Sequence, residues 1–248
     1  MIPLDFEKVE GYISDNIDTD FFDKKIAKLR AFTLSAVVKR KNPYLFKAKR
    51  VERAQDYIQQ VLDATVSSGE ESIFGDFLER LALHVCEQVY GAYKSSAIGI
   101  DIEFSDEGKR YIVSVKSGPN WGNSGQIRAL KKNFVDAKRI LSTSGGARGQ
   151  QIVCIEGCCY GIDNRPDKDT HLKLCGQRFW EFLSGGDEHL YRELIAPLGK
   201  SSEEKSLEVQ SLYNQKLNLL TAEFIALYCE EGLINWDRLL TANSGKTD

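Results

Sequence analysis

Two short segments with the pattern of β-strands carry acidic residues and a lysine. The first is Gly99-Ile-Asp-Ile-Glu-Phe104, and the second begins as Tyr111-Ile-Val-Ser-Val-Lys116. Residues 105–109 between them are typical of a hairpin turn. Since strand side chains alternate between faces, pairing across this turn can place Asp101, Glu103 and Lys116 beside one another at a sheet surface. Carboxylates with an adjacent ammonium are the groups needed to hold Mg²⁺ at a phosphodiester and to activate a water.

The same residues resemble a known motif. Asp101, followed after the turn by Ser114-Val-Lys116, is similar to the motif of the metal-dependent PD-(D/E)xK nucleases, and most of all to that of type II restriction endonucleases. The usual second part of the motif is acid-x-Lys, so this chain has a serine where a carboxylate is usual. In some restriction enzymes with this departure, a carboxylate from a helix fills the gap.

Other segments extend the resemblance over roughly residues 40 to 185. They resemble enzymes that cut interrupted palindromes of the GG/CC type, and the ordered set is more specific than the hairpin alone. These segments are Asn42-Pro-Tyr-Leu-Phe46, Phe74-Gly-Asp-Phe-Leu-Glu79, Lys116-Ser-Gly-Pro-Asn-Trp121 and Gln177-Arg-Phe-Trp-Glu-Phe-Leu183.

The resemblance implies an Mg²⁺-dependent enzyme that hydrolyses double-stranded DNA at a specific site. Asp101 would bridge the metal and the scissile phosphate, and Lys116 would orient or activate the attacking water. The Val115 carbonyl would complete the metal shell, and the remaining carboxylate would come from Glu79 or Glu103. A palindromic target matches a two-fold protein, so a homodimer with one active site per strand is implied.

Helical spacing favours Glu79 as the missing acid. Ser68-Gly-Glu-Glu71 fits a capping box that opens a helix toward Val89. On that helix Glu71, Gly75 and Glu79 form one stripe, and the glycine could let a phosphate or another backbone come close. Glu103 lies about 6 to 7 Å along the strand from Asp101, too far to share one metal easily. The alternative for Glu79 is a surface glutamate in an ion pair.

Two loops offer candidate DNA contacts. Asn120, Asn123, Ser124 and Gln126 follow Lys116 in a turn-rich loop that feeds a predicted helix at 124–142. They could donate hydrogen bonds to a phosphate, or they could be turn and cap residues.

The second loop is the long polar segment from residue 157 to residue 173. It carries Arg165, Lys168 and Lys173, and Arg and Lys side chains can read guanine in the major groove. A plain surface loop is the alternative.

Composition bounds the class of protein. The 248 residues are 42% apolar and carry a net charge of −3, which excludes a globally basic nucleic-acid binder but leaves local basic clusters at 39–53 and 128–139. The six cysteines contain no CxxC pair, which favours reduced, buried thiols over zinc. With no signal peptide and no apolar run near 18 residues, we expect a soluble, cytoplasmic protein that does not enter a membrane.

The expected fold is α/β, with a restriction-endonuclease-like mixed central sheet flanked by helices and with helical N-terminal and C-terminal additions. Residues 1–66 are expected to form a helical region for dimerisation and DNA contacts, and residues 67–248 a nuclease core with C-terminal helices. The patterns predict helices within 4–37, at 51–66 and from Ser201 and Ser202 to near Gly232, and a strand at 151–156.

Two other functions fit the sequence. Ser114 would suit a catalytically decayed nuclease fold that binds DNA without cutting it, and metal-dependent cleavage would argue against that function. A structural or repair-complex subunit could use the basic clusters to contact a protein, and salt-sensitive DNA affinity would argue against that function.

Overall fold

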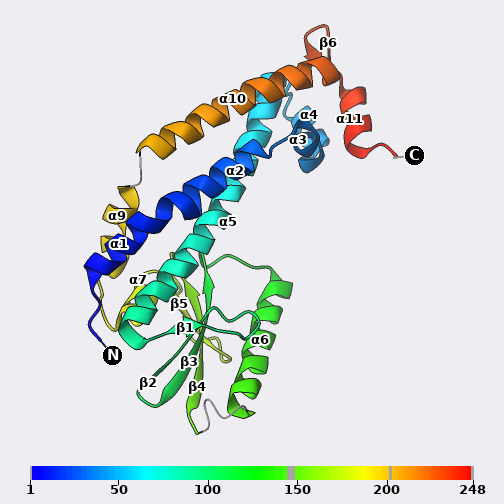
Figure 1. The fold of residues 1–248 in the computed structure, drawn as a ribbon. Helices are drawn as coiled ribbons and strands as arrows, with labels where there is room; N and C mark the ends of the chain where they lie inside the picture. Colours follow the sequence, from blue (N-terminus) through cyan, green and yellow to red (C-terminus); the bar gives the residue numbers. More distant parts are fainter. Residues whose placement is uncertain (1, 144–148, 201–202, 247–248) are drawn as a thin grey trace. The chain divides into compact units, whose positions relative to one another are not determined.

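The computed structural model describes residues 2–143, 149–200 and 203–246, and these form two compact units (Figure 1). Residues 2–17 and 74–200 form one, here called the sheet unit. Residues 18–73 and 203–246 form the other, the helical unit. This division differs from the expected boundary between residues 66 and 67. The first helix groups with the sheet, and the C-terminal helices group with residues 18–73.

The sheet unit contains a five-stranded mixed sheet with the strand order β1-β2-β3-β4-β5. β1, β2 and β3 pair antiparallel, whereas β3, β4 and β5 pair parallel. Parallel neighbours need long crossovers, and a helix supplies the one between β3 and β4. The strands are β1 Tyr93–Lys94, β2 Ile102–Asp106, β3 Lys109–Lys116, β4 Gln151–Cys158 and β5 Leu172–Cys175.

The predicted hairpin is present, with a tighter turn than expected. β2 and β3 extend to Asp106 and Lys109, which pair with each other. Glu107 and Gly108 form the two-residue turn, with φ of 46° and 75°. Two positive φ values are the signature of a type I′ turn, whose twist matches that of the flanking strands.

Helices cover both faces of the sheet, which confirms the expected α/β fold. On one face, Phe104 stacks on Tyr90 of α5 and contacts Phe182 of α7. On the other face, Ile112 packs with Leu130 and other apolar residues of α6. The helices of this unit are α1 Phe6–Ile17, the second half of α5 Ala54–Tyr90, α6 Ser124–Thr143, α7 Gln177–Ser184, α8 Leu190–Glu193 and α9 Ile195–Gly199.

The helix α5 corrects the prediction of two helices, at 51–66 and from residue 68 toward Val89. It is continuous over 37 residues. The capping box does not form, and the backbone carbonyl of Ser68 instead accepts a hydrogen bond from the Ser72 hydroxyl, at 3.3 Å. A glycine inside a helix costs about 1 kcal/mol, which packing along both halves of α5 can offset.

The helical unit has its own core of apolar side chains. Tyr57 of α5 contacts Phe46 and Phe224, and all three are buried. The elements are the π-helical segment η1 Asp18–Asp23, α2 Lys24–Arg30, α3 Leu34–Arg40, α4 Pro43–Ala48, the first half of α5, α10 Glu203–Tyr228, β6 Cys229–Glu230, β7 Leu233–Ile234 and α11 Trp236–Ser244.

Two helix predictions need correction in their bounds. The periodic region 4–37 is divided among α1, η1, α2 and α3, with a break at Thr33, whose side chain caps α3. The predicted start of the C-terminal helix at Ser201 and Ser202 lies outside the described residues. Its predicted end near Gly232 is wrong, because the chain leaves α10 at Tyr228 and forms the β6–β7 hairpin.

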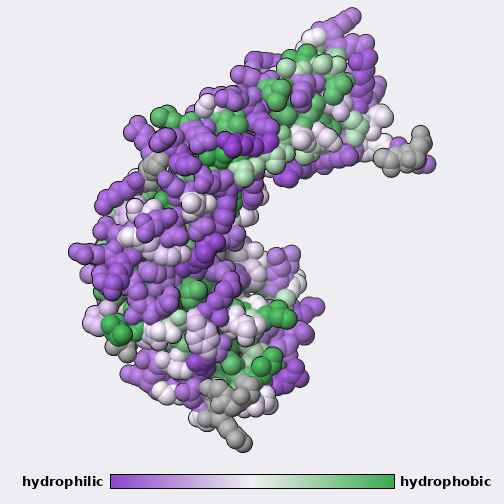
Figure 2. Space-filling model, in the orientation of Figure 1, coloured by the Kyte–Doolittle hydropathy of each residue, from purple (hydrophilic) through white to green (hydrophobic). Residues whose placement is uncertain are grey.

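The surface seen in Figure 2 is mostly hydrophilic, with hydrophobic residues gathered in small separate patches. Throughout the described ranges, no helix combines the length and the apolar character that crossing a membrane requires.

Candidate active site

Asp101, the residue immediately before β2, lies beside Lys116 at the end of β3. The Lys116 ammonium is 3.9 Å from Oδ2 of Asp101. It also donates hydrogen bonds to the Ser114 hydroxyl, at 2.9 Å, and to the Val115 carbonyl, at 2.7 Å. Both charged side chains are partly exposed, at 19% for Asp101 and 23% for Lys116. An anion in solvent can therefore reach a point where a carboxylate, a carbonyl oxygen and an ammonium converge.

The hairpin register positions these groups. Ile102 pairs with Val113, and the Asp101 amide donates to the Val113 carbonyl at 2.8 Å, which brings Asp101 level with Ser114. The Asp101 carboxylate then accepts a hydrogen bond from the Val115 amide at 2.6 Å. This short contact fixes the carboxylate beside the end of β3.

Glu79 of α5 lies near this point. Burial raises the pKa of Glu79, and the negative charge of Asp101 raises it further, which places the two carboxylates within electrostatic reach of each other. Its side chain is 30% exposed and pairs with Lys94 at 3.6 Å. One turn earlier, a Cβ on Gly75 would lie 3.5 Å from Cβ of Ser117, so this helix stripe faces the loop after Lys116.

Glu103 is held differently. It is 5% exposed and forms an ion pair with Arg110. It also accepts hydrogen bonds from Tyr93, at 3.2 Å, and from Ser95, at 2.9 Å. Both oxygens of Glu103 are therefore engaged in the β1–β3 region of the sheet.

The donor set at the end of β3 fits a hard divalent cation. Asp101 supplies a carboxylate and Val115 a carbonyl oxygen, and the Glu79 carboxylate interacts electrostatically with Asp101. Among the described residues, no group of three or more His, Cys, Asp or Glu side chains could hold a metal ion. Oxygen donors of this kind are the ones that hard divalent cations prefer.

The loop after Lys116 is partly used to cap α6. The Asn123 side chain accepts from the amides of Gly125, at 3.0 Å, and Gln126, at 3.1 Å. The Gln126 side chain accepts from the Asn123 amide in return, at 2.9 Å, which is the reciprocal arrangement of a capping box. Asn120 and Ser124 are exposed on the same loop and helix start.

The three basic residues predicted in the second loop lie in different environments. Arg165 is exposed, whereas Lys168 forms an ion pair with Asp163 at 3.0 Å. Lys173 lies in β5, and its side chain is only 12% exposed because its ammonium is paired with Glu156 at 2.8 Å. Lys173 is therefore not part of an exposed loop.

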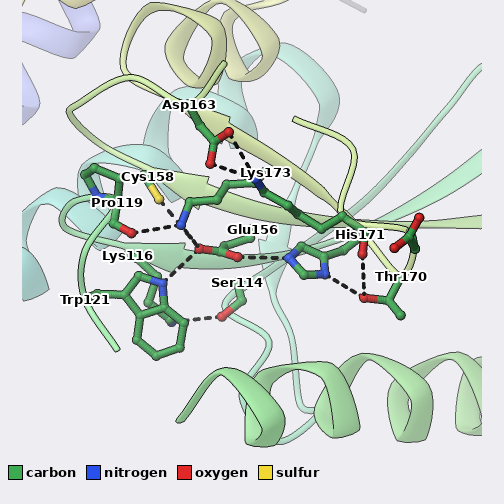
Figure 3. A network of polar contacts seen from close by, with 12 residues as sticks. Ser114, Lys116, Pro119, Trp121, Glu156, Cys158, Asp163, Thr170, His171 and Lys173 are labelled. Atoms are coloured by element: carbon green, nitrogen blue, oxygen red, sulfur yellow. Dashed lines mark hydrogen bonds and ion pairs between the residues drawn. The ribbon is translucent and has the colours of Figure 1, made fainter. Parts of the chain in front are cut away.

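Sequence reasoning missed a buried polar cluster beside Lys116 (Figure 3). Its centre is Glu156 of β4, which is 4% exposed and pairs in register with Ser114. Trp121, His171 and Lys173 surround this carboxylate, and the four residues are here called the Glu156 cluster. The available signal was a glutamate within the apolar run of residues 152–158, where a charge requires partners.

Burial alone would raise the pKa of Glu156. Hydrogen bonds from His171, Lys173 and Trp121 outweigh that effect and hold the pKa at about 2. Because an ionised carboxylate only accepts hydrogen bonds, Nε2 of His171 must carry the proton in its 2.9 Å contact with Glu156. The cluster is thus a satisfied buried charge next to the Asp101–Lys116 pair.

A mixed sheet flanked by helices, with a carboxylate and a lysine at neighbouring strand ends, defines a restriction-endonuclease-like α/β fold. The family model of the type II restriction endonuclease EcoO109I matches residues 7–206. The chain therefore belongs to this family and is a type II site-specific deoxyribonuclease whose substrate is DNA. Enzymes of this class generally use a divalent metal. The family favours an enzyme over a decayed module or a structural subunit. No curated protein gives a significant match to the chain.

Proposed function

We propose that this endonuclease belongs to the PD-(D/E)xK superfamily and hydrolyses double-stranded DNA with Mg²⁺ at the Asp101–Lys116 site. We further propose that it acts as a homodimer on interrupted palindromes of the GG/CC type. The convergence of the Asp101 carboxylate, the Val115 carbonyl and the Lys116 ammonium at the end of β3 carries the proposal.

Asp101, the Val115 carbonyl and Glu79 are the proposed metal-holding groups. When bound, Mg²⁺ would supply positive charge at the scissile phosphate and make a water more acidic. Glu79 is the proposed substitute for the acid that Ser114 lacks. The negative charge of Asp101, which helps to raise the pKa of Glu79, supports this choice over Glu103, whose oxygens are engaged by Arg110, Tyr93 and Ser95.

Lys116 is the proposed catalytic residue for the water and the phosphate. Its ammonium can hold a water by hydrogen bonding and can stabilise negative charge that develops on the phosphate oxygens. The hydrogen bonds that its ammonium donates to the Ser114 hydroxyl and the Val115 carbonyl support this role.

DNA contacts are proposed for the two loops and for residues 1–66. Asn120, Ser124 and Arg165 are exposed and can contact the phosphate backbone or base edges. Asn123, Gln126 and Lys168 would contribute while keeping their cap or ion-pair roles. Residues 1–66 remain the proposed region for dimerisation and further phosphate contacts, through the basic residues between 39 and 53.

The test is cleavage of a plasmid with Mg²⁺ by the wild-type protein and by three variants, followed by sequencing of the fragment ends. Asp101→Asn and Lys116→Ala should lose cutting by orders of magnitude while keeping their fold and their DNA affinity in Ca²⁺. Lys109→Ala, at the exposed opposite end of β3, is the matched control and should cut normally. Normal cutting by a folded Asp101→Asn or Lys116→Ala protein would reject the proposed site.

A further inference from the structure

Trp121 contacts both Glu156 and the Lys116 ammonium (Figure 3). Its indole nitrogen donates a hydrogen bond to Oε1 of Glu156 at 2.8 Å. The Lys116 ammonium lies over the face of the same ring, 5.1 Å from the ring centroid. One side chain thus contacts the buried carboxylate through its edge and the proposed catalytic lysine through its face.

Lysine needs such support because its side chain has four rotatable bonds. Hydrogen bonds to Ser114 and Val115 engage the ammonium from the strand, and the Trp121 ring engages it from the side of the loop. The negative face of an indole attracts a cation, and the attraction is strongest where water is partly excluded. The ring therefore restricts where the ammonium can lie, without removing any of its hydrogen-bond donors.

The position of Trp121 is fixed in turn by contacts to two strands. Its ring packs with the apolar residues of β3, β4 and α6. Lys173 bridges the same loop to the sheet, because its ammonium contacts Glu156 and also donates to the Pro119 carbonyl at 2.8 Å. His171 holds the second oxygen of Glu156 at 2.9 Å. These partners keep the Glu156 carboxylate ionised and hold it in one orientation.

We propose that Trp121 is a positioning residue for Lys116 and that Glu156 holds Trp121 in the orientation this requires. The proposal rests on the proposed function, in which Lys116 is the catalytic lysine. Neither Trp121 nor Glu156 needs to touch DNA or metal. Trp121 therefore contributes to catalysis by restricting the position of the Lys116 ammonium.

The catalytic test compares Trp121→Leu, Trp121→Phe and Trp180→Phe. Single-turnover cleavage of a plasmid at saturating enzyme with Mg²⁺ measures the chemical step, and binding to the same DNA with Ca²⁺ measures affinity. Trp180→Phe is the matched control, because the Trp180 indole also donates a hydrogen bond at 2.8 Å, to the Cys159 carbonyl.

Trp121→Leu should lower the cleavage rate by about 10- to 100-fold, the size of effect expected from a misplaced catalytic group. Trp121→Phe keeps a ring over the ammonium and should recover part of the rate. DNA affinity should stay close to wild type in both, and Trp180→Phe should cut at close to the wild-type rate. A wild-type rate in folded Trp121→Leu, or an equal loss in Trp180→Phe, would overturn the proposal.

A second measurement does not depend on activity. The three tryptophans give three indole N–H resonances in a ¹⁵N NMR spectrum, assigned by the Trp→Phe variants. Lys116→Met removes the charge above the ring and should shift the Trp121 resonance while leaving that of Trp180 in place. Glu156→Gln should shift the same resonance through its hydrogen bond.

The two proposals fail in different ways. If Lys116→Ala protein cuts normally, the proposed active site is wrong, and with it the catalytic role of Trp121. If Lys116→Ala is inactive but the Trp121 resonance does not respond to Lys116→Met, only the positioning role of Trp121 is rejected.

Discussion

Ser114 replaces the acid of the usual motif with a hydroxyl that joins the site as a hydrogen-bonding group. It accepts from Lys116 at 2.9 Å and lies 3.4 Å from Oδ2 of Asp101. A hydroxyl cannot supply the charge of a carboxylate, so the proposed metal site would need another acid. Glu79 and Glu103 differ sharply in how they are already partnered.

Glu79→Gln is expected to weaken cleavage, whereas Glu103→Gln is expected to retain it if the protein folds. The reason is that Glu79 lies within reach of the Asp101 charge, while Glu103 is engaged by Arg110. Cleavage rates across a Mg²⁺ titration should show that Glu79→Gln requires more metal. An inactive Glu103→Gln beside a normal Glu79→Gln would reverse the assignment, and normal rates in both would rule out the proposed metal shell.

Glu156 should make folding sensitive to acid. Its pKa in the folded protein is about 2, below the ordinary value of 4.5, so its stabilising contribution is present above about pH 4.5 and is lost as pH falls toward 2. The size is on the order of 3 kcal/mol at neutral pH. Glu156→Gln removes this titration. Urea unfolding should therefore show that the wild-type protein has the larger free energy of unfolding at neutral pH, and that this difference decreases in acid. If the free energy of unfolding depends on pH in the same way in both proteins, the ion pairs of Glu156 do not stabilise the fold as proposed.

At the scale of elements, β4 is the strand that connects the site to the core. One of its faces carries Glu156, while Gly157 on the other face lies directly against the Phe179 ring of α7. A Cβ on Gly157 would approach that ring to 2.1 Å, and Phe179 is fully buried. The glycine therefore lets α7 pack closely against the strand that holds the Glu156 cluster.

Gly157→Ala should destabilise the protein by about 1–3 kcal/mol, because the ring and the strand must separate. Gly75→Ala is the informative comparison. Its Cβ would meet Ser117 at an ordinary 3.5 Å inside α5, so a gain of up to about 1 kcal/mol is expected. Urea unfolding followed by circular dichroism measures both, and equal effects of the two substitutions would refute the packing argument.

At the scale of the whole molecule, the sheet unit contains the proposed Asp101–Lys116 site and the helical unit contains a separate apolar core. Two such sites related by a two-fold axis match the symmetry of a palindrome and allow each strand to be cut by its own site. The proposed homodimer has one such site per protomer.

Mixed dimers can test that arrangement. Wild-type protein and Lys116→Ala protein, carrying different affinity tags, are co-expressed and the doubly tagged species is isolated. A dimer with one intact site should nick supercoiled plasmid at the target and release little linear product. Efficient double-strand cutting by the purified mixed species, or a monomer in sedimentation experiments with DNA, would contradict the homodimer.

The sequence by itself determined the local features of this protein. Strand alternation and a turn between Phe104 and Tyr111 predicted the hairpin, and the spacing of Asp101 and Lys116 predicted their meeting at a sheet surface. The periodicity of residues 124–142 predicted α6 to within one residue at its end. These features depend on neighbours along the chain or on one tight turn, so they can be predicted from residue type and spacing.

Only the tertiary structure decided which side chains from distant parts of the sequence lie beside Asp101 and Lys116. Glu156, His171 and Lys173 meet Trp121 because β4 and β5 pair parallel to β3, a register that no local pattern encodes. The same applies to α5, where packing overrides the helix break suggested at Ser68 and Gly69. Long-range strand pairing and burial determine these outcomes, because a buried charge such as Glu156 is stable only where the fold brings its partners to it.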